Sequence, residues 1–280
     1  MLTRTFQHLP GIGARTESYL WEAGLGDWQD LEFPDRLNLP ARRIHTLASQ
    51  IDESRRRMDD GNFKYFEDRL PAGLHWRFFP EIRDRAVYLD IETTGLDRDY
   101  ETITTIALYD GKTIQTFVQG RDLEMFPDVI REYGTIITYN GKCFDVPFLE
   151  RYFGMSMAQV HIDLRYILKS LGFGGGLKGC ERSLGIDRGE LAGVDGFDAV
   201  LLWHEFMKTG RSAALETLLA YNVDDVVNLE LLMVQAFNRK VAQTPFAGTL
   251  GLGFPCQPQN PFCADAALVR RLRRAMPMRF

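Results

Sequence analysis

Apolar residues recur along the middle of the chain in short runs and in longer periodic segments, which predict alternating strands and helices. The short runs are rich in Val, Ile, Thr and Tyr, which favours strands at 86–91, 102–109, 113–118 and 135–139. The longer segments have apolar positions three and four residues apart, which predicts helices at 122–132, 145–153, 163–171, 177–184, 197–208 and 213–240. A strand hairpin, with a two-residue turn at Asp110-Gly111, followed by strands and helices predicts an α/β fold with a mixed sheet flanked by helices.

The residues before this pattern predict a small all-helical module. Thr3 is placed to cap a first short helix, and a turn containing Gly11 and Gly13 precedes a second helix at 15–23. A third helix is expected at 41–60. We therefore expect four segments: the helical module (1–60), an aromatic-rich connector (61–83), the α/β domain (84–240) and a Pro/Gly-rich tail (241–280) that ends in a basic helix, Asp265–Met276.

Composition supports a folded chain without a membrane anchor. Hydrophobic residues make up 45% and aromatic residues 12% of the 280 positions, which is enough for a packed core. No apolar run approaches the roughly 18–20 residues that cross a bilayer, and the first residues lack the apolar region of a secretory signal. We expect a cytoplasmic protein whose four cysteines are reduced and mostly buried.

The net charge of −5 is unevenly distributed, with an acidic middle segment and a basic last segment. An acidic middle does not favour nonspecific binding to nucleic acid, which normally uses Lys and Arg to neutralise phosphates. It fits a domain whose site holds divalent cations.

Two carboxylates at the end of the first predicted strand, Asp90 and Glu92, are the first chemical signal. Side chains at i and i+2 of a strand point to the same face, so these two charges lie side by side. Such a pair is difficult to keep ionised without a cation between the two groups.

Two later motifs add further carboxylates. Asp145 follows a buried strand at the start of a helix, where helix capping is an alternative explanation for an Asp. Tyr221 and Asp225 lie four residues apart and share one face of a helix, although such pairs are common. Asp224 is expected to point away and to be solvated.

Taken together, the motifs resemble those of the DEDD superfamily of ribonuclease H-like 3′–5′ exonucleases, in the branch that carries a tyrosine. The resemblance covers roughly 84–240, and it rests on Asp-x-Glu at 90–92, Asn-x-x-x-Phe-Asp at 140–145 and Tyr-x-x-x-Asp at 221–225. The helical first segment is similar to that of the YprB-type stand-alone bacterial group. No polymerase region accompanies the motifs in these 280 residues, so we do not expect proofreading in cis.

The resemblance implies a two-metal-ion nuclease. Mg²⁺ and Mn²⁺ prefer oxygen ligands, and two such ions can activate water and stabilise a leaving oxygen. Tyr221 would orient, and help to deprotonate, the attacking water. The implied metal ligands are Asp90, Glu92, Asp145 and Asp225.

Other residues are candidates for contact with a nucleic acid, DNA or RNA. The stretch Thr93, Thr94, Gly95 and Leu96 is placed to meet a terminal nucleotide, with an ordinary turn as the alternative. Asn140 either contacts substrate or holds its turn, and Lys178 either reaches a phosphate or is a solvated surface lysine. These alternatives stay open on the sequence alone.

The turn at Gly11 and Gly13 resembles a helix-hairpin-helix turn, whose backbone N–H groups hold a phosphate. A non-catalytic nucleic-acid-binding protein and a structure-selective endonuclease are alternative functions on the same fold.

Overall fold

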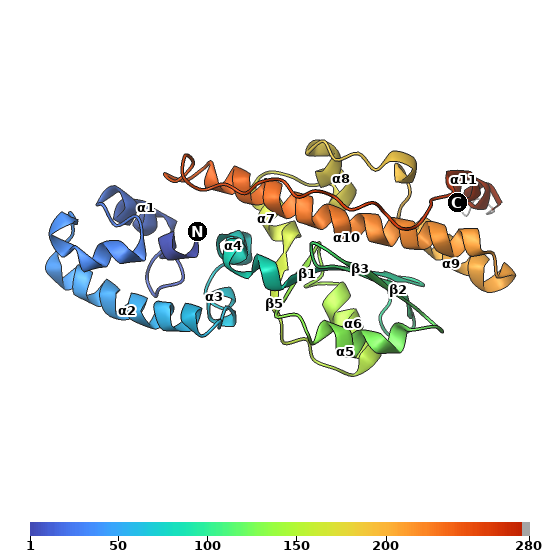
Figure 1. The fold of residues 1–280 in the computed structure, drawn as a ribbon, viewed down its shortest axis with the longest axis horizontal. Coiled ribbons are helices and arrows are strands. Elements are labelled where there is room, and N and C mark those ends of the chain that lie inside the picture. The colour runs from blue at the N-terminus through green and yellow to red at the C-terminus, as the bar shows by residue number, and fades with distance from the viewer. Residues whose placement is uncertain (276–280) are drawn as a thin grey trace. The chain divides into compact units, whose positions relative to one another are not determined.

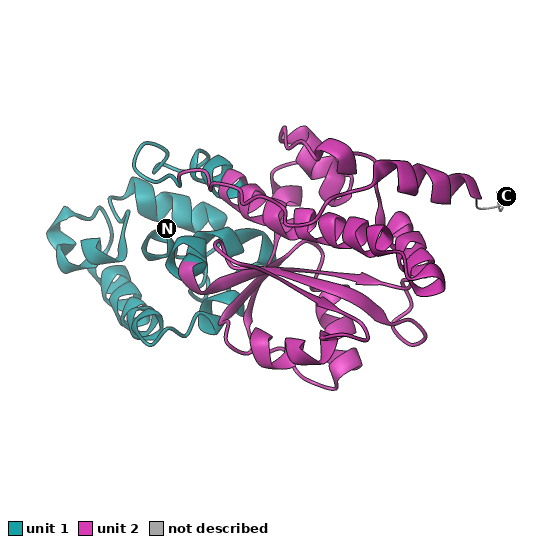
Figure 2. Cartoon of the chain, turned by 45° about the vertical axis from the view of Figure 1, so that its right-hand side comes forward, with its two compact units in different colours: residues 1–83, 236–252 teal, residues 84–235, 253–280 magenta. Residues whose placement is uncertain are grey.

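A computed structural model describes residues 1–275, and the chain divides into two compact units (Figure 2). Unit 1 comprises Met1–Arg83 and Ala236–Leu252, and unit 2 comprises Asp84–Gln235 with the residues after Leu252. The residues expected to form a connector lie in unit 1, and the expected tail is divided between the two units. The basic C-terminal helix begins at Ala266, and its expected end at Met276 lies outside the described residues.

Unit 2 is built on one five-stranded sheet in the order β3-β2-β1-β4-β5. β1 is antiparallel to β2, β2 is antiparallel to β3, and both β4 and β5 run parallel to β1. The predicted mixed sheet is therefore confirmed. The strands are β1 (Ala86–Thr93), β2 (Ile103–Tyr109), β3 (Ile114–Val118), β4 (Thr135–Thr138) and β5 (Val160–Asp163).

Two local features of the sheet differ from expectation. β5 was not predicted, because a four-residue strand that contains His161 and Asp163 is too short and too polar to give a periodic signal. The β2–β3 loop has four residues rather than two. Asp110 Oδ1 accepts hydrogen bonds from the N–H groups of Lys112 (2.9 Å) and Thr113 (2.7 Å), which stabilises the longer turn.

Helices cover both faces of this sheet, with α5 and α6 on one side and α10 across the other (Figure 1). Val87, Leu89 and Ile91 of β1 pack in one apolar core with Phe126 of α5 and Phe148 of α6. Because strand side chains alternate, Asp90 and Glu92 face the α10 side. The helices of unit 2 are η6 (Leu123–Met125), α5 (Phe126–Ile130), α6 (Asp145–Phe153), α7 (Leu164–Ser170), α8 (Gly176–Ser183), η7 (Gly189–Leu191), α9 (Gly196–Thr209), α10 (Ser212–Val241, whose last residues belong to unit 1) and α11 (Ala266–Ala275).

Unit 1 is helical and is organised around a buried ion pair. Both guanidinium NH groups of Arg77 donate to Glu17, at 2.7 and 2.8 Å, and Glu17 also accepts from the Phe6 N–H at 2.7 Å. A buried carboxylate with this many donors is well compensated for the loss of water. The elements of this unit are η1 (Leu2–Arg4), α1 (Ala14–Glu22), η2 (Trp28–Glu32), η3 (Pro34–Arg36), α2 (Ala41–Asp59), α3 (Lys64–Glu67), η4 (Ala72–Phe78) and α4 (Phe79–Ile82), followed at the boundary by η5 (Arg83–Arg85).

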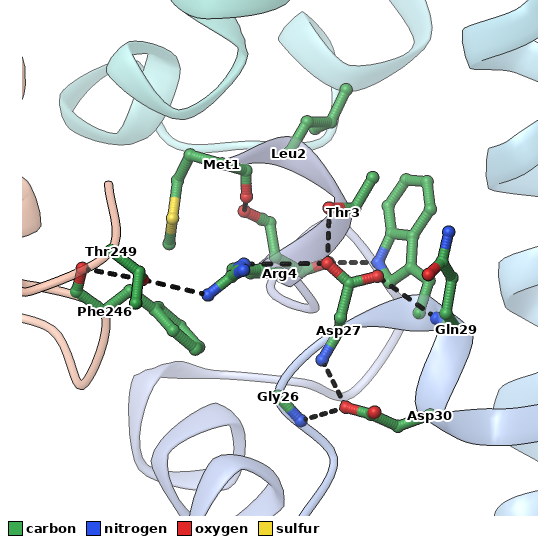
Figure 3. A network of polar contacts seen from close by, with 12 residues as sticks. Met1, Leu2, Thr3, Arg4, Gly26, Asp27, Gln29, Asp30, Phe246 and Thr249 are labelled. Carbon is green, nitrogen blue, oxygen red and sulfur yellow. Dashed lines mark hydrogen bonds and ion pairs between the residues drawn. The ribbon is translucent and has the colours of Figure 1, made fainter. Parts of the chain in front are cut away.

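The N-terminus is held by polar contacts rather than by the expected helix cap (Figure 3). Thr3 lies within η1, and its hydroxyl donates to Asp27 Oδ2 at 2.8 Å. The guanidinium of Arg4 lies 3.6 Å from the same carboxylate oxygen, 3.5 Å from Thr249 Oγ1 and 4.5 Å from the centroid of the Phe246 ring. These contacts join the first residues of unit 1 to its second segment.

Two further observations concern the cysteines and the helices. Cys180 is buried, whereas Cys143, Cys256 and Cys263 are exposed, so the expectation of mostly buried thiols is wrong. Across residues 1–275, none of the helices combines the length and the apolar character needed to span a bilayer.

A buried histidine in unit 1 predicts loss of stability in acid. Burial, and next the charge of Arg69, lower the pKa of His8 from 6.5 to about 3, and its Nε2 lies 2.8 Å from Ser54 Oγ. Between pH 6.5 and about pH 3, His8 is therefore protonated in the unfolded chain but neutral in the folded chain. The free energy of unfolding consequently falls as the pH falls through this range. We expect His8 to contribute a loss on the order of 3 kcal/mol at pH 4.

Urea unfolding between pH 7 and pH 4 measures this effect. His8→Gln removes the titrating group and should flatten the pH dependence, whereas His45→Gln, at an exposed position of α2, should leave it unchanged. The same slope in the wild type and in His8→Gln would contradict the prediction.

Candidate metal centre at the carboxyl edge of the sheet

Three carboxylates meet where β1 ends and α10 crosses the sheet. Asp90, Glu92 and Asp225 each offer an oxygen atom, and these oxygens lie within 4.8 Å of one another. Asp90 is partly exposed, while Glu92 and Asp225 are buried. Residues separated by more than 130 positions are thus brought to one small volume.

Asn222 of α10 holds the first of these carboxylates in place. Its Nδ2 donates to Asp90 Oδ2 at 2.7 Å and approaches the Asp90 backbone oxygen at 3.3 Å, while its Oδ1 accepts from Thr105 Oγ1 at 3.0 Å. Asn222 was not among the predicted site residues. Its position between Tyr221 and Asp225 on the inward face of α10 was the available signal.

Asp145 lies beside the three carboxylates but is not one of them. It is the first residue of α6, and its Oδ1 accepts from the Ile91 N–H at 3.3 Å, between the two β1 acids. Its charge also contributes to raising the pKa of Glu92. Asp145 therefore both begins a helix and lies beside the carboxylate site, so the two explanations considered for it are compatible.

Burial and the neighbouring charges shift the pKa values of these acids strongly. Burial is the largest cause for each, and it raises the pKa of Asp90 from 3.8 to about 7. Burial and then the charge of Asp90 raise the pKa of Glu92 and of Asp145 well above their ordinary values. Buried carboxylates of this kind become fully ionised when a cation lies among them, and an all-oxygen donor set fits a hard divalent ion such as Mg²⁺.

Arg188, in the loop after α8, already supplies a positive charge to this site. Its buried side chain pairs with Asp225, with Asp224 (Nε–Oδ2, 3.2 Å) and with Glu181 (Nε–Oε2, 3.5 Å). The prediction that Asp224 is solvated is therefore wrong. The sequence did not predict Arg188 as a site residue, because a single arginine in the loop after α8 belongs to no motif with a characteristic spacing.

Tyr221 is packed between positive charges and faces the acids. The ammonium of Lys178 lies 4.5 Å and the guanidinium carbon of Arg188 5.4 Å from the centroid of its ring. Burial, followed by the charges of Glu92 and Asp90, raises the pKa of Tyr221, so its phenol stays protonated.

Lys178 belongs to this site rather than to the solvated surface. It is half-buried, and its Nζ donates to the Val194 backbone oxygen. Burial, and next the charge of Arg188, lower the pKa of Lys178 from 10.5 to about 8. The side chain is therefore still largely cationic at neutral pH, although burial has removed part of its hydration.

The stretch after β1 lines an apolar cavity that adjoins the carboxylates. Thr93 Oγ1 donates to the Gly95 oxygen at 2.5 Å, and Thr94 Oγ1 donates to Glu101. Leu96 is 84% exposed. The cavity has a volume of about 450 Å³ and is lined by Ile91, Glu92, Thr93, Thr94, Gly95, Leu96, Phe144, Gly196, Phe197 and Val200.

Asn140 sits in a strained turn that Asp163 organises. Its φ of 69° lies in the left-handed region, and Asp163 accepts from the N–H groups of Asn140 (2.8 Å) and Lys142 (3.1 Å). Gly141 is required in this turn, because a Cβ there would lie 2.3 Å from Thr138 Oγ1. The Asn140 side chain accepts a hydrogen bond from Arg165.

The two glycines of the predicted phosphate-binding hairpin lie in unit 1. Gly11 has a φ of 76°, and Gly13 is the N-cap of α1. Both are exposed. The first element of the hairpin is the 3₁₀ helix η1 rather than an α-helix.

Comparison with known proteins identifies the α/β region. A model of the RNase_H superfamily matches residues 87–237. The matched range contains all five candidate catalytic residues. No curated protein has a sequence significantly similar to that of this chain.

Several solved structures are similar at low identity. A family B DNA polymerase from the hyperthermophilic archaeon Pyrobaculum calidifontis is 18% identical over 56% of this chain, with a TM-score of 0.44. This chain spans only 24% of that polymerase. A nuclease in its apo form is 20% identical over 56% of this chain and 73% of its own, with a TM-score of 0.41. Brucella melitensis NrnC with bound Mg²⁺ is 18% identical over 70% of this chain and 85% of its own, with a TM-score of 0.39.

The position of Arg188 predicts competition with a metal ion. Two unit charges 4 Å apart repel by about 4 kcal/mol at an effective dielectric constant of 20, so a cation that uses Asp225 is opposed by the guanidinium. We expect Arg188→Gln to tighten Mn²⁺ binding by about tenfold, equivalent to about 1.4 kcal/mol. Isothermal titration calorimetry measures the change.

Arg131→Gln is the matched control, because Arg131 is exposed and pairs only with Asp128 among the described residues. It should leave the Mn²⁺ affinity unchanged. Weaker binding by Arg188→Gln would mean that the guanidinium supports the metal site instead of competing with the metal.

Proposed function

Because this chain belongs to the ribonuclease H superfamily, we propose that it is a metal-dependent nuclease that removes nucleotides from the 3′ end of a nucleic acid strand. The observation that carries the proposal is the meeting of Asp90, Glu92 and Asp225 within 4.8 Å, at the edge where β1 ends. Ligands in α/β folds bind at the carboxyl ends of the strands. The substrate is DNA or RNA.

The proposed metal ligands are Asp90, Glu92, Asp145 and Asp225. Two Mg²⁺ or Mn²⁺ ions held there would lower the pKa of a bound water and stabilise the leaving oxygen. The chain's own contribution is to hold the carboxylates ready: Asn222 orients Asp90 through a 2.7 Å hydrogen bond, and the Ile91 N–H orients Asp145. Fixed ligands reduce the reorganisation needed during reaction.

Tyr221 is proposed to position the attacking water. Its pKa is raised by burial and next by Glu92, so the phenol keeps its proton and can orient the water as a hydrogen-bond donor. The expected help of Tyr221 in deprotonating the water is therefore not part of this proposal. Lys178, whose ammonium lies 4.5 Å from the centre of that ring, supplies a positive charge on the substrate side. Phosphate oxygens are a suitable anion for this partly desolvated ammonium.

The terminal nucleotide is proposed to occupy the apolar cavity beside Glu92. Thr93, Thr94, Gly95 and Leu96 form one wall, and Phe144 and Phe197 supply aromatic surface. Aromatic side chains bind bases by stacking without selecting a sequence. We also propose that the turn at Gly11 and Gly13 holds a phosphate of the nucleic acid, as in the helix-hairpin-helix turns that it resembles. The similarity to the YprB-type group is likewise a proposal.

Loss of individual carboxylates should abolish hydrolysis. Asp90→Asn and Asp225→Asn each remove a charged ligand while keeping side-chain size, so we expect activity to fall by about 100- to 1000-fold or more. A time course on end-labelled DNA and RNA with Mn²⁺ measures this, and a circular substrate separates exonuclease from endonuclease action. Asp128→Asn, at an exposed carboxylate of α5, is the control. Equal activity of Asp90→Asn and the wild type would overturn the proposal.

Removal of the Tyr221 hydroxyl should separate turnover from metal binding. We expect Tyr221→Phe to lower kcat by about 10- to 100-fold, the range seen when groups that orient metal-site ligands are lost. The Mn²⁺ affinity, measured calorimetrically, should stay within about twofold. An unchanged kcat would exclude the role given to the tyrosine.

A further inference from the structure

A second cavity lies along the same edge of the sheet as the carboxylates. It has a volume of about 700 Å³ and is open to solvent. Its lining combines two cations, two aromatic rings and a run of glycines, and it shares no residue with the apolar cavity beside Glu92. The lining residues are Tyr139, Asn140, Arg165, Lys169, Gly172, Phe173, Gly174, Gly175 and Gly176.

Sheet register fixes where this cavity lies relative to the acids. β4 pairs with β1 in parallel through Tyr88 and Ile137, and β5 pairs with β4 through Thr138 and Asp163. The carboxyl ends of β1, β4 and β5 therefore lie at the same end of the sheet. The acids lie at the end of β1, and the cavity lies beyond the ends of β4 and β5. Neighbouring strands are about 4.8 Å apart, so the two places are adjacent.

Helix α8 connects the two places directly. Its first residue, Gly176, lines the cavity, and two residues later Lys178 lies over the ring of Tyr221. A ligand that reaches from the carboxylates past Lys178 would therefore enter this cavity next.

The charges of the cavity are available to a ligand. Arg165 and Lys169 are both exposed on α7, and neither forms an ion pair with any carboxylate in the described part of the chain. The side chain of Arg165 is directed by its hydrogen bond to Asn140. Two unneutralised cations one helical turn apart repel each other, and an anion between them relieves that repulsion.

The glycine-rich loop adds backbone donors to these cations. Gly172, Gly175 and Gly176 have φ values of 88°, 83° and 73°, which only glycine adopts readily. Within residues 1–275, the N–H groups of Gly174 and Gly175 have no hydrogen-bond acceptor. Successive free N–H groups in such a loop form a concave site for phosphate oxygens.

We propose that this cavity, which we name the glycine-loop cavity, binds a phosphodiester and its adjoining base in the strand whose end enters the metal centre. A cationic groove with aromatic rings is the usual composition of a site for single-stranded nucleic acid, and Tyr139 and Phe173 supply the rings. The inference rests on the proposed nuclease function and extends it from the terminal nucleotide to the following part of the strand.

The test compares two pairs of charge reversals. Arg165→Glu with Lys169→Glu alters the glycine-loop cavity, whereas Lys112→Glu with Arg131→Glu removes the same charge from exposed positions at the opposite edge of the sheet. Each double variant and the wild type are measured for binding of fluorescent ten-nucleotide DNA and RNA strands, with Ca²⁺ in place of Mn²⁺, by anisotropy at several salt concentrations. Hydrolysis of the decamers and of dinucleotides is then measured with Mn²⁺.

We expect the cavity variant to bind the preferred decamer at least tenfold more weakly. The slope of log affinity against log salt should become shallower by about 1.4, as two phosphate contacts to a single strand are lost. The ratio of kcat/KM for decamer to that for dinucleotide should fall at least tenfold, and the control pair should match the wild type within about twofold.

Four outcomes would overturn the inference: no change in the cavity variant, an equal loss in both double variants, an equal loss for decamer and dinucleotide, or competition by a free mononucleotide as strong as by the decamer. Arg165→Gln with Lys169→Gln repeats the test if the charge reversal does not fold. A wild type that binds the decamer through these residues without hydrolysing it would refute the proposed function alone. Hydrolysis of the decamer that is unchanged by replacing Arg165 and Lys169 would refute the role of the glycine-loop cavity alone.

Discussion

The mutual repulsion of buried carboxylates is the constraint on which the rest of unit 2 depends. Oxygen atoms of Asp90, Glu92 and Asp225 lie within 4.8 Å of one another, with Asp145 beside them. Because these side chains are withdrawn from water, their ionised forms are unfavourable. The fold compensates with one amide, one backbone N–H and one guanidinium, from Asn222, Ile91 and Arg188. The hydrophobic core on the other face of β1 supplies the stability that lets these groups stay together.

A sheet with one apolar and one acidic face separates stability from chemistry. Val87, Leu89 and Ile91 point into the core against α5 and α6, while Asp90 and Glu92 point toward α10. Replacing a core aromatic such as Phe126 would destabilise the fold by about 3–5 kcal/mol. Neutralising Glu92 instead relieves its repulsion with Asp90, whereas neutralising Asp225 also removes the charge that pairs with Arg188.

Most of this arrangement was predictable because its signals are periodic or closely spaced. The short apolar run at 86–91 predicted β1, and the Asp-x-Glu spacing predicted a shared face for Asp90 and Glu92. Helix α6 was predicted at its observed bounds because an Asp start and a Gly end frame it. The proximity of Asp225 to these acids was implied only by a family resemblance, since spacing in sequence carries no distance in space.

The remainder depended on tertiary contacts that leave no local pattern. The four-residue β5 exists because β4 offers it a hydrogen-bonding edge, and Asp163 at its end then supports the Asn140 turn. Arg188 is significant only because its loop folds back onto α10. Exposure of three cysteines likewise follows from packing and not from composition.

Helix α10 has a consequence for how the gene can be rearranged. Its thirty residues, Ser212–Val241, carry Tyr221 and Asp225 in unit 2 and end in unit 1, where Phe237 packs against Trp76. Deleting the first 83 residues would therefore remove Trp76 and leave the Phe237 ring without this contact. The unit boundary after Gln235 falls inside this one helix, so cutting the chain there would also shorten the helix that bears the catalytic candidates.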